Sequence, residues 1–162
     1  MTLTAERLRS RLRYDPLTGQ FFWLARGQGV PDPSREAGRV NSNGYREICV
    51  DLRLYSAQRL AWLYMTGSWP AGDVDHEDTA RANNRWANLR EATKAQNQAN
   101  SRVRKSNTSG FKGVHFGGGR WQAQIRINGK KVHLGCFDTP EAASGAYERA
   151  LLAAHGEFGR VA

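Results

Sequence analysis

The chain has few of the residues that stabilise small proteins covalently. Only two of its 162 residues, Cys49 and Cys136, are cysteines. Two thiols cannot form a disulfide framework or a four-cysteine zinc site within one chain, so we expect no zinc site. Any metal bound by this protein should therefore have oxygen and nitrogen ligands.

Long apolar segments are also missing. The longest apolar run is far shorter than the roughly 20 residues that cross a bilayer, and the N-terminal segment lacks the apolar centre of a signal peptide. We therefore expect a soluble cytoplasmic protein, neither secreted nor bound to a membrane.

Acidic side chains are scarce relative to basic ones. Asp and Glu number 15 against 24 Lys and Arg, a formal net charge of +9, which favours a polyanionic partner. The excess is uneven: residues 1–100 carry 14 basic and 11 acidic side chains, and residues 101–162 carry 10 and 4. The basic residues thus point to a nucleic acid without distinguishing DNA from RNA, and most strongly in the C-terminal part.

Apolar spacing predicts alternating helices and strands in the first 70 residues. Ser56 is a suitable N-cap for a helix carrying Leu60 and Leu63, and Gly67 should end that helix. The other elements expected here are a helix from Thr4 to Arg13, a strand from Gln20 to Leu24, a loop from Ala25 to Ser42 and one half-buried strand containing Ile48, Val50, Leu52 and Leu54.

The segment from Gly72 to Ser101 has the most informative pattern. We expect strands at Val74–His76 and Asn88–Ala92, joined by the polar loop Glu77–Ala87. Thr93 and Gln96 have the spacing of a capping box, which begins a helix and places Asn97 in its first turns. Asp75 and Asn97 could then converge.

The order of polar residues in this segment resembles the HNH nuclease family, in its phage homing-endonuclease branch, which implies a protein of a bacterial or phage-infected host cell. Eleven residues separate Asp75-His76 from Asn88, which begins the run Asn88-Leu89-Arg90, and eight residues separate Asn88 from Asn97. The resemblance implies a ββα-metal core at about residues 72–101, with Asp75 and Asn97 as ligands of one divalent ion, Mg²⁺ or Mn²⁺. Such ions prefer oxygen ligands and leave positions for water and phosphate.

The same resemblance assigns roles to the remaining residues of the motif. His76 is the expected general base, because a neutral imidazole can take a proton from water near physiological pH. Asn88 should brace the loop and orient the histidine, and Arg90 should contact phosphate. We interpret Asn83, Asn84 and Asn100 as ordinary loop and helix-surface residues. Relatives often have histidine at the position of Gln58, to which we assign no catalytic role.

A second module is expected after a basic linker at residues 101–108. The domains would then be residues 1–100 with the nuclease module, the linker with Arg102, Arg104 and Lys105, and residues 109–162. In residues 109–162 the sequence pattern predicts three strands, around residues 110–116, 120–127 and 130–137, with a hairpin turn at Asn128-Gly129. A helix capped by Thr139 and ended by Gly156 follows, with the inward stripe Ala142, Ala143, Ala146, Tyr147, Ala150 and Leu151. The fold class is therefore α+β: a ββα-metal module followed by a small three-stranded antiparallel sheet packed on one helix.

The middle strand alternates between two kinds of side chain. Trp121, Ala123, Ile125 and Ile127 share one face, and Arg120, Gln122, Gln124 and Arg126 share the other. Arginine and glutamine are suited to reading base edges in the major groove, although a solvated sheet face is the plainer interpretation.

Residues from Ser109 to about Gly159 resemble the DNA-binding domain of plant ethylene-response (Apetala-type) factors. The resemblance rests on Gly113-Val114, on the run from Trp121 to Arg126, on the run from Leu134 to Phe137, and on Ala142, Ala143, Ala146 and Tyr147. It implies that the DNA-facing residues include Lys112, His115, Gln124, Arg126, Lys131 and His133.

Together these patterns predict a metal-dependent endonuclease that acts on double-stranded DNA. One active site per chain favours a nick, and a monomer on DNA is the simplest state, with a dimer left open. Two alternatives remain: a non-catalytic DNA-binding regulator with a degenerate nuclease motif, and a protein that binds or cleaves RNA.

Overall fold

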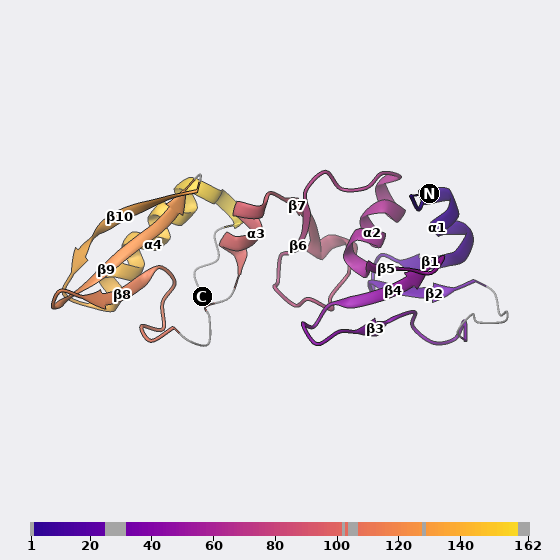
Figure 1. Ribbon diagram of the computed structural model, residues 1–162, viewed down its shortest axis with the longest axis horizontal. Helices are drawn as coiled ribbons and strands as arrows, with labels where there is room; N and C mark the ends of the chain where they lie inside the picture. Colours follow the sequence, from indigo (N-terminus) through magenta and orange to yellow (C-terminus); the bar gives the residue numbers. More distant parts are fainter. Residues whose placement is uncertain (1, 25–31, 102, 104–106, 128, 159–162) are drawn as a thin grey trace. The chain divides into compact units, whose positions relative to one another are not determined.

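The computed structural model describes residues 2–24, 32–101, 103, 107–127 and 129–158. The chain forms two compact units, Met1–Ala92 and Thr93–Ala162 (Figure 1). Each combines helices with small antiparallel sheets, so the predicted mixture of helix and sheet is confirmed. Across the described segments, no helix is long and apolar enough to span a membrane.

The first unit begins with helix α1, Ala5–Arg11, and a hairpin of strands β1, Leu12–Asp15, and β2, Gln20–Trp23. The Thr4 hydroxyl accepts a hydrogen bond from the main-chain N–H of Arg7 at 3.2 Å, which caps the helix. The prediction that this helix continues to Arg13 is wrong. Leu12 and Tyr14 are buried at alternate positions, as strand residues are, and their pairing with β2 replaces the last helical turn.

Three strands form the next sheet, in the order β3, Arg39–Val40, β4, Arg46–Val50, and β5, Arg53–Ser56. The prediction of one strand through residues 48–54 is wrong, because Asp51 and Leu52 have φ of 48° and 63° and turn the chain back on itself. Positive φ at both central residues suits a two-residue hairpin. Strand β3 and the bridge between Phe22 and Glu36 fall in the predicted loop, of which residues 25–31 lie outside the described part of the chain.

Helix α2, Ala57–Thr66, follows Ser56 and ends at Gly67, whose φ of 82° is the left-handed conformation of a helix C-cap, as predicted. Strands β6, Asp73–His76, and β7, Leu89–Ala92, pair antiparallel, and a short 3₁₀ helix η1, Trp86–Asn88, precedes β7. The core of this unit gathers side chains from α1, α2 and the strands, among them Leu8, Leu12, Phe21, Ile48, Val50, Leu60 and Leu63.

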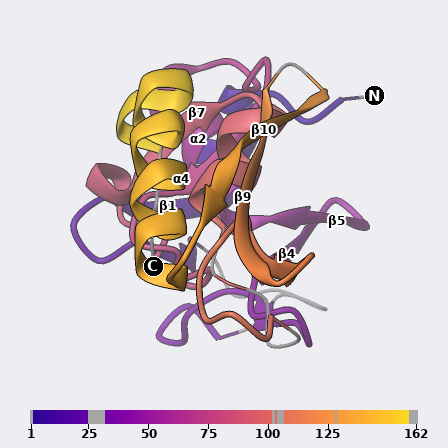
Figure 2. The same ribbon diagram turned by 90° about the vertical axis from the view of Figure 1, so that its left-hand side faces the viewer.

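The second unit starts with helix α3, Lys94–Asn100. Its sheet has the order β10, Lys130–Phe137, β9, Arg120–Ile127, and β8, Val114–Gly117. Helix α4, Pro140–His155, lies along one face of that sheet (Figure 2), and η2, Gly156–Phe158, follows it. Thr139 and Gly156 bound α4 as predicted.

The sheet and α4 bury small side chains against each other. Ala123 and Ala143 are fully buried, and a Cβ atom at Gly113 would collide with the ring of Tyr147. Strand β8 begins later than predicted, since Gly110 and Gly113 adopt positive φ and keep the preceding residues out of the strand. Ala142, predicted to face inward, is exposed, because the contact stripe of α4 begins at Ala143.

Candidate functional site

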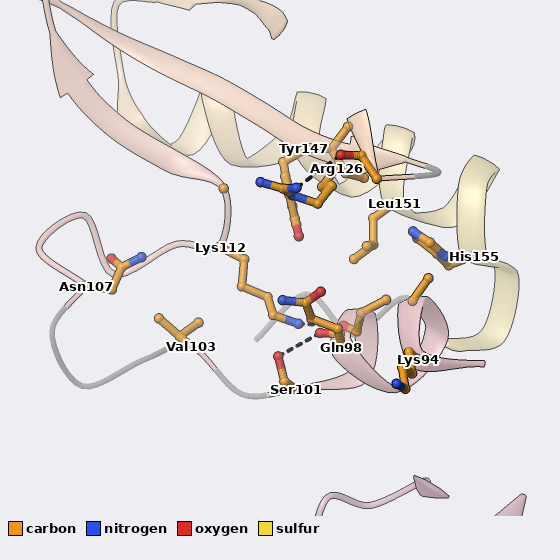
Figure 3. A pocket seen from close by; sticks show the side chains of 15 residues that line it. Lys94, Gln98, Ser101, Val103, Asn107, Lys112, Arg126, Tyr147, Leu151 and His155 are labelled. Carbon is orange, nitrogen blue, oxygen red and sulfur yellow. Dashed lines mark hydrogen bonds between the residues drawn. The ribbon is translucent and has the colours of Figure 1, made fainter. Parts of the chain in front are cut away.

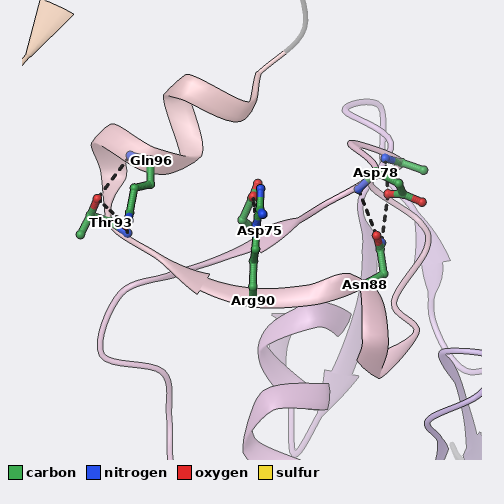
Figure 4. Close-up of polar contacts among 7 residues, drawn as sticks. Asp75, Asp78, Asn88, Arg90, Thr93 and Gln96 are labelled. Carbon is green, nitrogen blue, oxygen red and sulfur yellow. Dashed lines mark hydrogen bonds and ion pairs between the residues drawn. The ribbon is translucent and has the colours of Figure 1, made fainter. Parts of the chain in front are cut away.

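The predicted metal ligand Asp75 is ion-paired with the predicted phosphate contact Arg90. The two residues face each other in the register of β6 and β7, and Arg90 Nε donates to Asp75 Oδ2 at 3.1 Å (Figure 4). The Asp75 side chain is only 6% exposed and that of Arg90 is 18% exposed. The hairpin therefore fixes the carboxylate close to its strand, with a cation beside it.

The predicted general base His76 is nearly buried. Its ring lies 6.0 Å from that of Tyr45, centroid to centroid, and its Nε2 is 3.1 Å from Asn84 Oδ1. Burial lowers the pKa of His76, and the hydrogen bond with Asn84 and the nearby carboxylates of Asp78 and Asp75 offset this only in part. The imidazole is therefore neutral near physiological pH, as proton acceptance requires.

Asn84 is a site residue that the sequence interpretation missed. Its side chain contacts His76, and its main-chain oxygen accepts a hydrogen bond from the Tyr14 hydroxyl at 2.6 Å. Asn84 is 1% exposed and Asn100 is 3% exposed, so placing both on the surface was wrong. No local pattern marks Asn84, because its burial comes from a hairpin about 70 positions earlier in the chain.

Asn88 closes the loop that follows His76. Its Oδ1 accepts from the main-chain N–H of Asp78 at 3.0 Å, and its Nδ2 donates to Asp78 Oδ1 at 3.0 Å and to the main-chain oxygen of Asn83 at 2.8 Å. Figure 4 shows Asn88 and Asp78 facing each other. Burial opposes ionisation of Asp78, but hydrogen bonds from Asn83, Ala80 and Asn88 outweigh it and lower the pKa of this carboxyl.

The second predicted metal ligand, Asn97, lies on α3 in the second unit. The capping box that precedes it is present: Thr93 Oγ1 accepts from Gln96 N at 3.3 Å, and Gln96 Oε1 accepts from Thr93 N at 2.9 Å (Figure 4). The ion shared by Asp75 and Asn97 stays a prediction. In the described residues, His, Cys, Asp and Glu side chains do not gather in groups of three or more that could hold a metal. One carboxylate and one amide oxygen still fit Mg²⁺, which usually keeps several water ligands.

The face of the second unit's sheet that points away from α4, called here the open face, carries most of the residues predicted to meet DNA. Residues paired across neighbouring strands share a face. By this register the open face contains His115 opposite Gln122, His133 opposite Gln124, Lys131 opposite Arg126, and Arg120 at the start of β9. The alternation predicted for β9 is confirmed, since Ala123 and Ile125 pack in the cores on the other face.

Several open-face side chains are held by neighbours. Arg120 pairs with Asp138 at 2.7 Å, Gln122 Nε2 donates to Gly117 O at 3.0 Å, and Arg126 donates to Gly129 O at 3.0 Å. Three further predicted DNA contacts, Arg102, Arg104 and Lys105 of the linker, lie outside the described residues, as does Asn128 of the predicted hairpin turn.

Lys112 points toward α3 and not across the open face. Its Nζ donates to the main-chain oxygen of Ala99 at 2.6 Å, beside a pocket of about 550 Å³ (Figure 3). Among the described residues, the pocket lining includes the basic or titratable Lys94, Lys112, Arg126 and His155 and no acidic side chain. Lys112 thus borders a basic hollow within the second unit, and Arg126, which the strand register assigns to the open face, also reaches this hollow near the end of β9.

Comparisons with known proteins agree with the motif. A family model described as HNH endonuclease matches residues 55–99. Protein 3.8 of Escherichia phage T7 is 33% identical over 102 residues, which are 61% of this chain and 84% of the phage protein. The chain belongs to the HNH endonuclease family. The HNH match contains Asp75, His76, Asn88 and Asn97, and also Asn84.

The C-terminal region of this HNH protein is similar to plant proteins. APETALA2-like protein 2 of Oryza sativa subsp. indica is 44% identical over 54 residues, 32% of this chain and 12% of the plant protein. AP2-like ethylene-responsive transcription factor TOE2 of Arabidopsis thaliana is 44% identical over 54 residues, 32% of this chain and 11% of its own length. The chain thus spans about a tenth of these plant relatives. No solved structure matches the chain.

Proposed function

We propose that this HNH protein is a metal-dependent endonuclease that hydrolyses phosphodiester bonds in double-stranded DNA. The observation that carries the proposal is the environment of His76. Its imidazole is buried, has a lowered pKa and is hydrogen-bonded to Asn84, and the residue lies next to Asp75 inside the HNH match. A neutral imidazole in a fixed orientation is suited to accept the proton of an attacking water.

Asp75 and Asn97 are the proposed metal ligands. When they bind Mg²⁺ or Mn²⁺, the ion supplies positive charge that stabilises the scissile phosphate and its leaving oxygen. Arg90 holds Oδ2 of Asp75 and so orients the carboxylate. We also propose that the Arg90 guanidinium contacts a DNA phosphate.

Asn88 acts on the loop and not on the substrate. By tying Asp78 and Asn83 to the start of β7, it keeps the chain that leaves His76 in one conformation. A fixed loop lowers the freedom of the histidine backbone, and positioning of this kind contributes to catalysis without touching the reacting atoms.

The open face of the second unit is the proposed DNA-docking surface. It combines Arg120, Arg126 and Lys131 with Gln122, Gln124, His115 and His133, a mixture of phosphate-binding and base-reading side chains. Support comes from the likeness of this region to the APETALA2-like and ethylene-responsive proteins of plants. The linker residues Arg102, Arg104 and Lys105 add positive charge for the backbone.

We further propose that each chain nicks one strand, as a monomer with one active site, and leaves a 5′-phosphate and a 3′-hydroxyl. The competing function is a DNA-binding regulator without catalysis, which the likeness to plant transcription factors favours. Incubation of supercoiled plasmid with Mg²⁺, Mn²⁺ or EDTA separates the two functions. We expect open circles to accumulate before linear DNA, with metal only. Duplex binding without conversion in any metal would support the regulator.

A further inference from the structure

The hairpin of β1 and β2 fixes the backbone at Asn84. The Tyr14 hydroxyl donates to the Asn84 main-chain oxygen in a buried contact of 2.6 Å, and the N–H of Trp86 donates to Pro16 O at 3.0 Å. Burial raises the pKa of Tyr14, so its hydroxyl stays a donor. Gly19, at φ 77°, lies so close to the peptide between Asn84 and Arg85 that a Cβ atom there would collide with it.

The side chain of Asn84 has only one orientation that satisfies its neighbours. Its Nδ2 donates to the main-chain oxygen of Ala82 at 3.2 Å, which leaves Oδ1 facing His76 Nε2 at 3.1 Å. An amide oxygen can only accept a hydrogen bond, so Nε2 must carry the proton. In a neutral imidazole protonated at Nε2, the lone pair is on Nδ1.

We propose that Asn84 is a positioning residue of the nuclease site, which holds neutral His76 as the Nε2–H tautomer so that Nδ1 accepts the proton of the attacking water. This inference rests on the proposed function, in which His76 is the general base. It also gives the N-terminal hairpin a role in catalysis, because Tyr14 and Gly19 set the position of Asn84.

The two asparagines of the loop then have separate tasks. Asn88 binds Asp78 and the Asn83 backbone and holds the loop together. Asn84 binds the ring of His76. Replacement of Asn83, whose Nδ2 donates to Asp78 at 2.7 Å, weakens the loop without removing the contact to His76 and is therefore the matched control.

The tautomer can be read directly from the nitrogen NMR spectrum of the full chain labelled with ¹⁵N-histidine. The chain has four histidines, and a His76→Gln variant identifies the signals of His76. Above the usual imidazole pKa of about 6.5, we expect the native protein to show a protonated Nε2 and an unprotonated Nδ1. Asn84→Asp should keep this tautomer because a carboxylate also accepts, whereas Asn84→Ala should give a mixture. A native spectrum with the proton on Nδ1 overturns the proposal.

Cleavage kinetics give the second test. Asn84→Ala should lower kcat about 10- to 100-fold with little change in duplex affinity, Asn84→Asp should recover part of the loss, and Asn83→Ala should lose less than Asn84→Ala. Equal losses for Asn83→Ala and Asn84→Ala, without rescue by Asn84→Asp, would mean that Asn84 only stabilises the loop. If Asn84→Ala does not fold, Tyr14→Phe removes one hydroxyl and should shift the same nitrogen signals.

The spectrum is recorded without DNA, so it also separates this inference from the proposed function. A native protein that has the Nε2–H tautomer but cleaves no DNA refutes the nuclease proposal and leaves the tautomer established. A native protein that cleaves DNA with the proton on Nδ1 refutes the role of Asn84 and leaves the nuclease proposal intact.

Discussion

Asp75 and Arg90 are directly opposed on strands β6 and β7, with Arg90 Nε 3.1 Å from Asp75 Oδ2. Because the strand register creates this pair, the carboxylate proposed to bind a metal is oriented by the fold itself. The low exposure of both side chains also makes the pair a stability element, since an unpaired buried charge is costly.

Arg90→Met should lower the free energy of unfolding by about 3 kcal/mol, because it leaves the Asp75 carboxylate without its cation. Urea denaturation measures this. The exposed pair of Arg7 and Asp51, with side chains 51% and 41% accessible, is the control, and Arg7→Met should cost much less stability than Arg90→Met because solvent screens the pair. Similar losses for the two variants would contradict the buried role of Arg90.

Replacing Gln58 on α2 with an apolar residue should have the opposite effect and stabilise the protein. Gln58 is only 8% exposed, and its buried Oε1 accepts no hydrogen bond from any described residue. Gln58→Met removes this unsatisfied acceptor and should raise the free energy of unfolding by about 1 kcal/mol. Gln58→Glu, which places a charge at the same position, should lower it. A destabilised Gln58→Met protein would indicate that the amide has a partner after all.

The fold was predictable wherever a local signal determines an element. Thr93 with Gln96, Thr139 and Gly67 bound helices through contacts within one turn, and each boundary was found. The turn at Asp51 and Leu52 was missed because Leu52 continues an alternating apolar pattern while being 98% exposed. Periodicity reports which residues are apolar, not where a chain reverses.

Cleavage should depend on pH through the ionisation of His76. Burial, which outweighs the hydrogen bond with Asn84, lowers the pKa of His76, and only the neutral ring accepts a proton. The rate should therefore fall as the pH falls, with an apparent pKa below the usual imidazole value of about 6.5. Single-turnover rates measured with saturating DNA and metal test this. A midpoint above that value would mean that another group, or His76 in a different environment, controls the rate.

The open face should supply duplex affinity. Lys131→Gln removes one cation from the side of the sheet opposite α4 and should reduce the slope of log affinity against log salt by about one. Arg149→Gln removes one exposed cation from α4 and is the matched control, expected to leave the slope unchanged. Fluorescence anisotropy with duplex DNA at several salt concentrations compares them. A larger effect of Arg149→Gln would place DNA on the other side of this unit.

The sequence did not reveal the features of the candidate site that depend on contacts between distant segments of the chain. The spacing from Asp75 and His76 to Asn88 and Asn97 was enough to find the HNH motif. The role of Asn84 was not visible, because it depends on Tyr14 and Gly19 reaching the loop from the N-terminal hairpin. Polar residues in a loop look alike in sequence until the packing around them is known.

The most direct test of the account is cleavage of supercoiled plasmid by native protein and by His76→Ala, at equal and saturating duplex occupancy, with Mg²⁺ or Mn²⁺ and with EDTA. We expect native protein with metal to form open circles, EDTA to abolish this, and His76→Ala to bind the DNA as tightly but to cleave it at least about 100-fold more slowly. Unchanged cleavage by His76→Ala, or binding without cleavage by the native protein in every metal, would contradict this expectation.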